Sequence, residues 1–178
     1  GGCDTVHLSE EFGTPLYIYD EITLRQMCQS FVGEFVSRYT NTLIAYASKA
    51  FINPALARII NEEGLGLDVV SGGEIAVANA ANFPREKIFF HGNNKTPAEL
   101  EYALSSHVGT IVVDGFSELT LLSQIADRLG KEQNIMLRLS PSVDAHTHQH
   151  TTTGILDSKF GFSMETGDAA TAIGLALK

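Results

Sequence analysis

The sequence contains few of the residues that mark several common classes of protein. It has no tryptophan, only two cysteines, and 12 basic residues against 21 acidic ones, which gives a net charge of −9. This acidic balance disfavours a nucleic-acid backbone or an anionic membrane as the main partner. No apolar run approaches the roughly 18 residues that a membrane-spanning helix needs, so we expect no membrane span.

The two cysteines, Cys3 and Cys28, lie too far apart in the sequence to form a CxxC pair or a set of metal ligands. The first residues carry neither the basic stretch nor the apolar stretch of a secretory signal. We therefore expect two reduced thiols in a cytoplasmic protein. The chain has 178 residues, of which 44% are hydrophobic and 19% charged, and it can build one sizeable globular core.

The chain is organised as a repeat, in which a short apolar run is followed by a helical pattern about every 22–24 residues. The apolar runs are Leu43–Ala47, Leu65–Val70, Ile88–Phe90, Ile111–Val113 and Ile135–Leu139. Runs this short and continuous are typical of strands buried on both faces. Strands that alternate with helices imply a parallel sheet with right-handed crossovers.

Start and stop signals bound the predicted helices. The expected starts are Asn53-Pro54, the S-x-x-E spacing of Ser71–Glu74, the combined cap and proline of Thr96–Glu99, and Ser117. The expected stops are Gly64, Gly109 and Gly130.

Five such units could begin either a (β/α)8 barrel or an open doubly wound sheet. No G-x-G-x-x-G stretch follows the first strand, so the open dinucleotide-binding fold loses support. Polar residues follow the carboxyl ends of the predicted strands, where barrel enzymes build their sites. The predicted fold class is therefore α/β, as a partial (β/α)8 TIM barrel of about five units.

Two segments precede the repeat. Residues 14–20 (TPLYIYD) are expected to form a strand, and residues 21–36 an amphipathic helix. We therefore divide the chain into an N-terminal strand and helix, residues 1–36, and the first part of a barrel, residues 37–178. A full barrel takes about 250 residues. Because the chain shows only five strand signals, we expect it to be an N-terminal fragment.

Lys49 and Asp68 are the first candidates for chemistry. Lys49 follows a predicted buried strand, where desolvation would favour the neutral amine, a nucleophile suited to Schiff-base formation. Asp68 ends the next strand, where an unpaired carboxylate is costly, so Lys49 would be a natural partner for it. The alternatives are a solvated lysine at a strand end and a cap or turn role for Asp68.

Four stretches then give the chain a recognisable signature. These are YASKA at residues 46–50, GLDVVSGGE at 66–74, HGNNK at 91–95 and TGILDSKFG at 153–161. In this order they resemble the fold-type III decarboxylases that use pyridoxal 5'-phosphate, and within them the diaminopimelate branch. The resemblance runs from about Phe12 to the end of the chain and implies a barrel whose first strands carry the cofactor lysine.

The resemblance also implies roles for single residues. Lys49 would bind the cofactor covalently, Asp68 would be its acidic neighbour, and Arg138 would lie under the cofactor and contact this acidic network. His91 and Asn93 would line the cofactor pocket. Glu74 would support these residues without taking part in the chemistry, although a capping box alone would explain it. For Arg138 a purely structural salt bridge is the alternative, because burial of its charge demands a partner.

Three histidines, His146, His148 and His150, would share one face of a strand, which could suggest a metal site. They lie in a polar stretch without apolar alternation, and no carboxylate or cysteine has ligand spacing, so we predict no metal. The resemblance places this stretch in a loop near the active-site mouth. His148 and Lys159 are therefore candidate substrate contacts, with a loop-anchoring role as the alternative for Lys159.

The implied reaction is the decarboxylation of meso-2,6-diaminopimelate to L-lysine and CO2, a step of lysine biosynthesis, by an enzyme that is a homodimer when intact. In the family, residues 14–20 would join a second β-domain. The family's phosphate loop, pyridine acid and distal-carboxylate ligands have no counterpart among these residues. We therefore expect the 178-residue chain alone to bind the cofactor poorly and to show little activity.

Three other functions remain open on these residues. The chain could belong to another basic amino-acid decarboxylase of the same fold, acting on ornithine, arginine or carboxynorspermidine. It could be a non-catalytic paralogue that acts as a binding protein, although Lys49, Asp68 and Arg138 are all present. It could also be a one-domain pyridoxal-phosphate carrier, which the leading segment 14–20 argues against.

Overall fold

The computed structural model describes residues 2–141 and 160–177. The helices are α1 (Thr5–Phe12), α2 (Glu21–Val36), α3 (Pro54–Glu62), α4 (Gly72–Ala80), α5 (Pro97–Ser105), α6 (Phe116–Leu129) and α7 (Asp168–Ala176), with short 3-10 turns η1 (Ser48–Ala50) and η2 (Arg85–Lys87). The strands are β1 (Ala45–Ala47), β2 (Gly66–Val69), β3 (Ile88–Phe90), β4 (Thr110–Val113), β5 (Ile135–Leu137), β6 (Leu139–Ser140) and β7 (Phe162–Ser163). No helix within these described ranges is long and apolar enough to cross a membrane.

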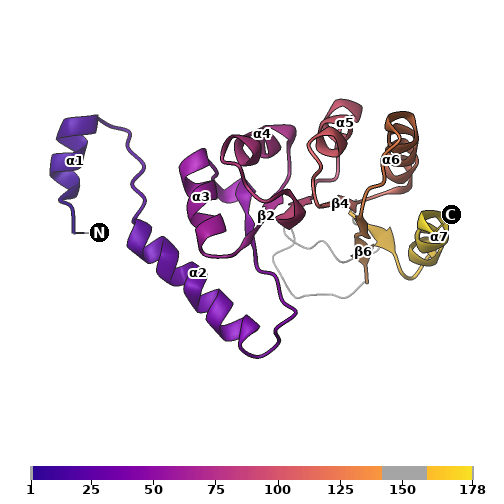
Figure 1. Cartoon of the computed structure of the whole chain (residues 1–178), viewed down its shortest axis with the longest axis horizontal. Helices are drawn as coiled ribbons and strands as arrows, with labels where there is room; N and C mark the ends of the chain where they lie inside the picture. Colours follow the sequence, from indigo (N-terminus) through magenta and orange to yellow (C-terminus); the bar gives the residue numbers. More distant parts are fainter. Residues whose placement is uncertain (1, 142–159, 178) are drawn as a thin grey trace.

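Strands β1 to β5 form one sheet in sequence order, and every neighbouring pair is parallel. Helices α3 to α6 lie side by side along one face of this sheet (Figure 1). A second, two-stranded parallel sheet joins β6 to β7. The predicted alternation of parallel strands and helices is therefore confirmed.

The core lies between the sheet and the helices. Side chains of the sheet that face the helices are fully buried, including those of Leu67, Val69, Phe90 and Ile111. The expectation that both faces are buried is wrong for part of the sheet, because Met136 in β5 is 51% exposed. In the described ranges, helices α3 to α6 cover one face, and the other face stays partly open to solvent (Figure 1).

The start signals are confirmed for α3 and α5 and wrong for α6. The side chain of Asn53 accepts a hydrogen bond from the backbone of α3, and Thr96 with Glu99 forms a complete capping box. Helix α6 begins one residue before Ser117, with Gly115 as its cap, so Ser117 lies inside the first turn. A glycine that precedes a helix can adopt the extended cap conformation without a side-chain bond.

The capping box expected at Ser71–Glu74 is only half formed. The Ser71 hydroxyl accepts from the backbone N–H of Glu74, at 3.3 Å. The Glu74 carboxylate accepts instead from the backbone N–H of Val70, at 2.8 Å. Val70 directly follows β2, so Glu74 ties the end of the strand to the first turn of α4.

Two of the three predicted stop glycines end helices. Gly64 and Gly130 take positive φ angles just after α3 and α6, as the stop signal requires. Gly109 does not end α5, because that role falls to His107, which has a φ of 57°. Gly109 instead allows a close backbone approach, since a Cβ there would lie 2.5 Å from the carbonyl oxygen of Glu86.

The N-terminal segment departs furthest from expectation. Helix α1 was not expected, and Asp4 begins it by accepting a hydrogen bond from its first turn. The strand predicted for residues 14–20 is wrong, because no described segment pairs with it and its side chains are mainly exposed. Tyr19 stacks on Phe51 at 4.8 Å between ring centroids. Helix α2 matches its predicted bounds, whereas the proposed domain boundary after residue 36 stays a prediction.

Candidate active site

A hollow of about 620 Å³ lies at the carboxyl ends of β1, β2, β3 and β5. Its lining residues are Lys49, Asp68, Val70, His91, Gly92, Asn93, Asn94, Arg138 and Phe160. All five residues that the sequence assigned to the cofactor are among them. They come from four different β/α units and meet because parallel strands place their carboxyl ends at the same edge of the sheet.

Lys49 lies in η1, directly after β1. Its amine makes no hydrogen bond or ion pair with another described residue, and the residue is exposed. The expectation of a desolvated lysine is therefore wrong for this chain, since helices α3 to α6 cover the opposite face of the sheet (Figure 1) and the hollow opens to solvent. What the position does provide is an amine that no described residue engages, at the rim of a polar hollow.

The carboxylate of Asp68 is held by His91. The imidazole Nδ1 of His91 donates a hydrogen bond to Oδ1 of Asp68, because an ionised carboxylate can only accept. Strands β2 and β3 are paired so that Asp68 lies beside Phe89, which brings His91 to the same edge. The partner predicted for Asp68 from the sequence is Lys49, whereas the partner in the structure is His91. The observed pairing fixes the imidazole orientation, and no other described residue binds the ring at Nε2.

Arg138 also has a different partner from the one expected. Its guanidinium donates to Oδ1 of Asp114 at 3.0 Å, and not to Asp68. The guanidinium carbon lies 4.5 Å from the ring centroid of Phe160, a cation–π contact. Asp114 directly follows β4, as other polar residues of the hollow follow their strands, and this position was the signal that could have identified it.

Two carboxylates that do not line the hollow, those of Glu74 and Glu99, hold the backbone that follows β2 and precedes α5. Glu99 of α5 accepts from the backbone N–H groups of Gly72 and Thr96, each at 3.0 Å. These two bonds, the Gly72 bond foremost, hold the pKa of the Glu99 carboxyl below its usual value of 4.5. Glu74 holds the end of β2 in the same way, which fits the supporting role expected of it.

The structure leaves some predicted residues without a test. Asn93 lines the hollow and is exposed. His148 and Lys159 lie outside the described residues, so their assignment to substrate contacts stays a prediction. Two further residues, Lys95 and Glu118, have no role predicted from the sequence and form a buried ion pair behind the hollow, at 2.7 Å.

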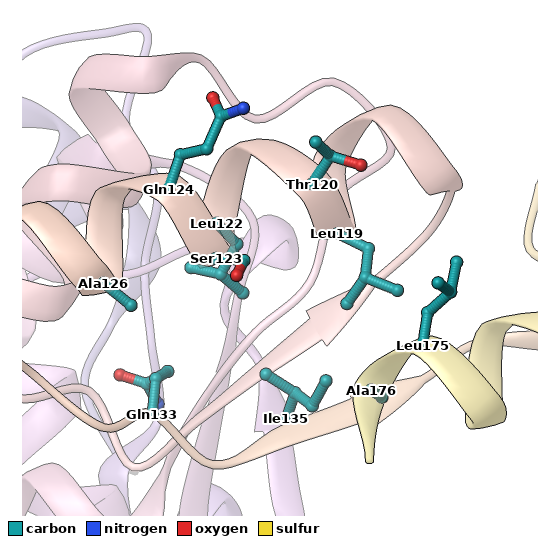
Figure 2. Close-up of a pocket in the computed structure, with 10 residues that line it drawn as sticks. All are labelled: Leu119, Thr120, Leu122, Ser123, Gln124, Ala126, Gln133, Ile135, Leu175 and Ala176. Carbon is teal, nitrogen blue, oxygen red and sulfur yellow. The ribbon is translucent and has the colours of Figure 1, made fainter. Parts of the chain in front are cut away.

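A second hollow, of about 370 Å³, lies between α6, β5 and α7 (Figure 2). Leu119, Leu122, Ile135 and Leu175 line it together with small residues and uncharged polar ones. None of its lining residues can donate or accept a proton near neutral pH or act as a nucleophilic amine. This hollow therefore lacks the groups that the first hollow offers for catalysis.

Comparison with known proteins agrees with this geometry. The family model described as pyridoxal-dependent decarboxylase, pyridoxal binding domain, matches residues 23–177. A diaminopimelate decarboxylase of Bacillus subtilis (strain 168) is 49% identical over 173 residues, which cover 97% of this chain and 39% of the relative. The chain thus spans about two fifths of the length of that relative.

Solved structures give the same result. The diaminopimelate decarboxylase of M. jannaschii, in co-complex with L-lysine, has a TM-score of 0.87 and 38% identity. The match covers 99% of the present chain and 42% of the M. jannaschii chain. The lysine/ornithine decarboxylase of Vibrio vulnificus, complexed with putrescine, has a TM-score of 0.72 and 25% identity. This match covers 97% of the present chain and 41% of the Vibrio vulnificus chain. The sequence-based assignment is confirmed: this chain belongs to the pyridoxal-binding domain family of the pyridoxal-dependent decarboxylases.

Proposed function

We propose that the gene product containing this chain is a pyridoxal-phosphate enzyme that decarboxylates meso-2,6-diaminopimelate to L-lysine and CO2. The observation that carries the proposal is the meeting of Lys49, the Asp68–His91 pair and Arg138 around one hollow at the strand ends. The likeness to diaminopimelate decarboxylases over nearly the whole chain supports the choice of substrate.

The residues present fit the cofactor. Pyridoxal phosphate is an aromatic aldehyde with an anionic group, and when bound it supplies an electron sink for the pair left by the departing carboxylate. Lys49 offers the amine that would hold the aldehyde carbon. Arg138 and the His91 imidazole would provide positive charge and a hydrogen-bonding group beside it.

The chain's own groups can also manage the proton on the lysine. The Lys49 ammonium must lose a proton before its nitrogen can act as a nucleophile. Asp68 is a carboxylate in the same hollow, and His91 keeps it oriented. We propose that Asp68 receives or shares that proton. Over the whole reaction the substrate loses its carboxylate as CO2, and a proton takes its place.

The experiment compares variants of the full gene product, expressed from the complete open reading frame. We expect Lys49→Ala to abolish both the visible absorbance of lysine-bound cofactor and the release of CO2 from diaminopimelate. Lys87→Ala is the matched control and should keep both, because the Lys87 amine donates to the carbonyl of Gly64 near the amino ends of β2 and β3, away from the residues that line the hollow. Undiminished CO2 release by the Lys49→Ala protein would refute the assignment.

A second candidate is a related decarboxylase of ornithine, arginine or carboxynorspermidine, which the likeness to a lysine/ornithine decarboxylase favours. The higher identity and TM-score of the diaminopimelate decarboxylase argue for our first choice. Measuring CO2 from all four substrates decides between them. A protein that binds the cofactor but releases CO2 from none of them would be a non-catalytic paralogue.

We further propose, from the family resemblance, that the gene product is a cytoplasmic homodimer which needs neither nucleic acid nor a membrane. Light scattering on the purified gene product would give its mass in solution, and a mass equal to that of one polypeptide would contradict the dimer. Cell fractionation with activity assays would test the compartment.

A further inference from the structure

Lys95 is a buried ammonium with a full set of acceptors. Its side chain is 1% exposed. In the sequence Lys95 comes two residues after Asn93, in the segment that also carries His91. The three N–H groups donate to the carbonyl oxygens of Gly92 at 2.6 Å and Val112 at 2.8 Å, and to Glu118 at 2.7 Å. Full pairing is what allows such a charge to be buried.

Glu118 extends this arrangement to the other side of the hollow. One carboxylate oxygen accepts from Lys95, and the other accepts from the backbone N–H of Asp114, at 3.3 Å. The side chain of Asp114 in turn accepts from Arg138. The Glu118 and Asp114 side chains are only 10% and 7% exposed. A continuous chain of hydrogen bonds therefore runs from Gly92 to Arg138.

The two residues at the ends of this chain of hydrogen bonds, Gly92 and Arg138, both line the candidate active site. Gly92 stands between His91 and Asn93 and has a φ of 113°, a conformation that favours glycine. Its carbonyl is one of the groups that Lys95 holds. Arg138 lines the hollow from the end of β5. One buried pair thus fixes two lining segments that come from different β/α units.

We propose that Lys95 and Glu118 are positioning residues, which set the placement of His91 and Arg138 for the cofactor without touching it. A buried ion pair is seldom the most stable way to fill such a space, since apolar residues of similar volume are often equally stabilising. The relevance to the cofactor rests on the proposed function, whereas the placement of His91 can be measured without any cofactor.

The first readout is the His91 imidazole in the 178-residue chain without cofactor. Its carbon-bound ring protons, assigned with a His91→Gln variant, report on the hydrogen bond to Asp68 in ¹H–¹³C NMR spectra. We expect Lys95→Met/Glu118→Leu, which replaces the pair by apolar residues, to shift and broaden these signals. The control Glu101→Gln/Arg128→Met removes an exposed ion pair between α5 and α6, the helix that also carries Glu118, and should leave these signals unchanged.

The second readout is cofactor affinity in the full gene product, followed by absorbance on titration with pyridoxal phosphate. We expect the double variant to bind about tenfold more weakly or worse, because small displacements of lining groups have large effects. The Glu101/Arg128 control should match the wild type. Should the wild type itself not bind the cofactor, the proposed function fails, and the His91 spectrum alone decides the positioning role.

Glu118→Gln keeps the experiment decisive if the double variant does not fold. Lys95 and the Asp114 N–H donate to different oxygens of Glu118, and in the glutamine an NH2 group that cannot accept takes the place of one of these oxygens. We expect a smaller shift of the His91 signals and an intermediate loss of affinity. A folded variant of either kind with unshifted His91 signals, and with an affinity within about twofold of the wild type, would overturn the proposal.

Discussion

Removing Lys95 alone should destabilise the fold much more than removing it together with Glu118. In Lys95→Met the carboxylate of Glu118, 10% exposed, keeps its charge but loses its cation, and this loss of one partner of a buried pair lowers the free energy of unfolding by about 3–5 kcal/mol. In Lys95→Met/Glu118→Leu neither charge of this pair remains. The acceptors at Gly92 and Val112 and the Asp114 N–H lose their partner, but the packing of the two apolar side chains offsets most of that cost, and we expect a net loss of about 2 kcal/mol or less.

Urea denaturation, followed by circular dichroism, measures both values. With a slope of about 2 kcal/mol per M, the single variant should lower the urea midpoint by about 1.5–2.5 M, and the double variant by about 1 M or less. Glu118→Leu completes the double-mutant cycle and gives the coupling energy between the two side chains. A midpoint that moves by less than about 0.3 M in Lys95→Met would refute the predicted coupling, and so would effects of the two single variants that simply add.

Three other predictions concern stability. Ser48 is 2% exposed, and its hydroxyl has no partner among the described residues. Ser48→Ala should therefore leave the thermal midpoint unchanged, or raise it by an amount that corresponds to up to about 1 kcal/mol in the free energy of unfolding. A clearly lower midpoint would contradict this prediction. At Gly66 a Cβ would lie 2.6 Å from the carbonyl oxygen of Lys87, so Gly66→Ala should destabilise the fold by about 1–3 kcal/mol in urea denaturation. The matched change Gly33→Ala, in α2 with open space around it, should stabilise by about 0.5–1 kcal/mol, and equal effects at the two glycines would argue against this reading. The lowered pKa of Glu99 means that its contribution to stability is present above pH 4.5 and is lost as the pH falls through the lower, folded-state value. Glu99→Gln should therefore flatten the pH dependence of the thermal midpoint below about pH 5, and an unchanged slope would count against the cited hydrogen bonds.

Local signals predicted the parts of the fold that depend on residues close together in sequence. The capping box at Thr96–Glu99 and the Asn53 cap formed as predicted, because their partners lie within one helical turn. The prediction that Ser117 caps α6 is wrong, because serine, a residue type that favours caps, also fits inside the first turn of a helix. The strand predicted for residues 14–20 failed because a strand needs a neighbour, and no described segment provides one.

The candidate site likewise has features that the sequence predicted and features that depend on the tertiary structure. The position of Lys49 after the first strand, and the motifs around it, were sufficient to predict the family and the cofactor, since both depend on residue types in a fixed order. The exposure of Lys49 was not predictable, because it depends on which surfaces cover the ends of the strands. Sequence pattern alone cannot show that helices lie on only one face.

The sequence by itself determined the repeat of strand and helix and therefore which edge of the sheet would carry the polar residues. The tertiary structure decided which of those residues are paired. Asp68 with His91, Lys95 with Glu118 and Asp114 with Arg138 each join neighbouring β/α units, at separations of 23, 23 and 24 residues. Such pairs form only when strand register and helix placement bring two side chains within hydrogen-bond distance, and no local pattern encodes that distance.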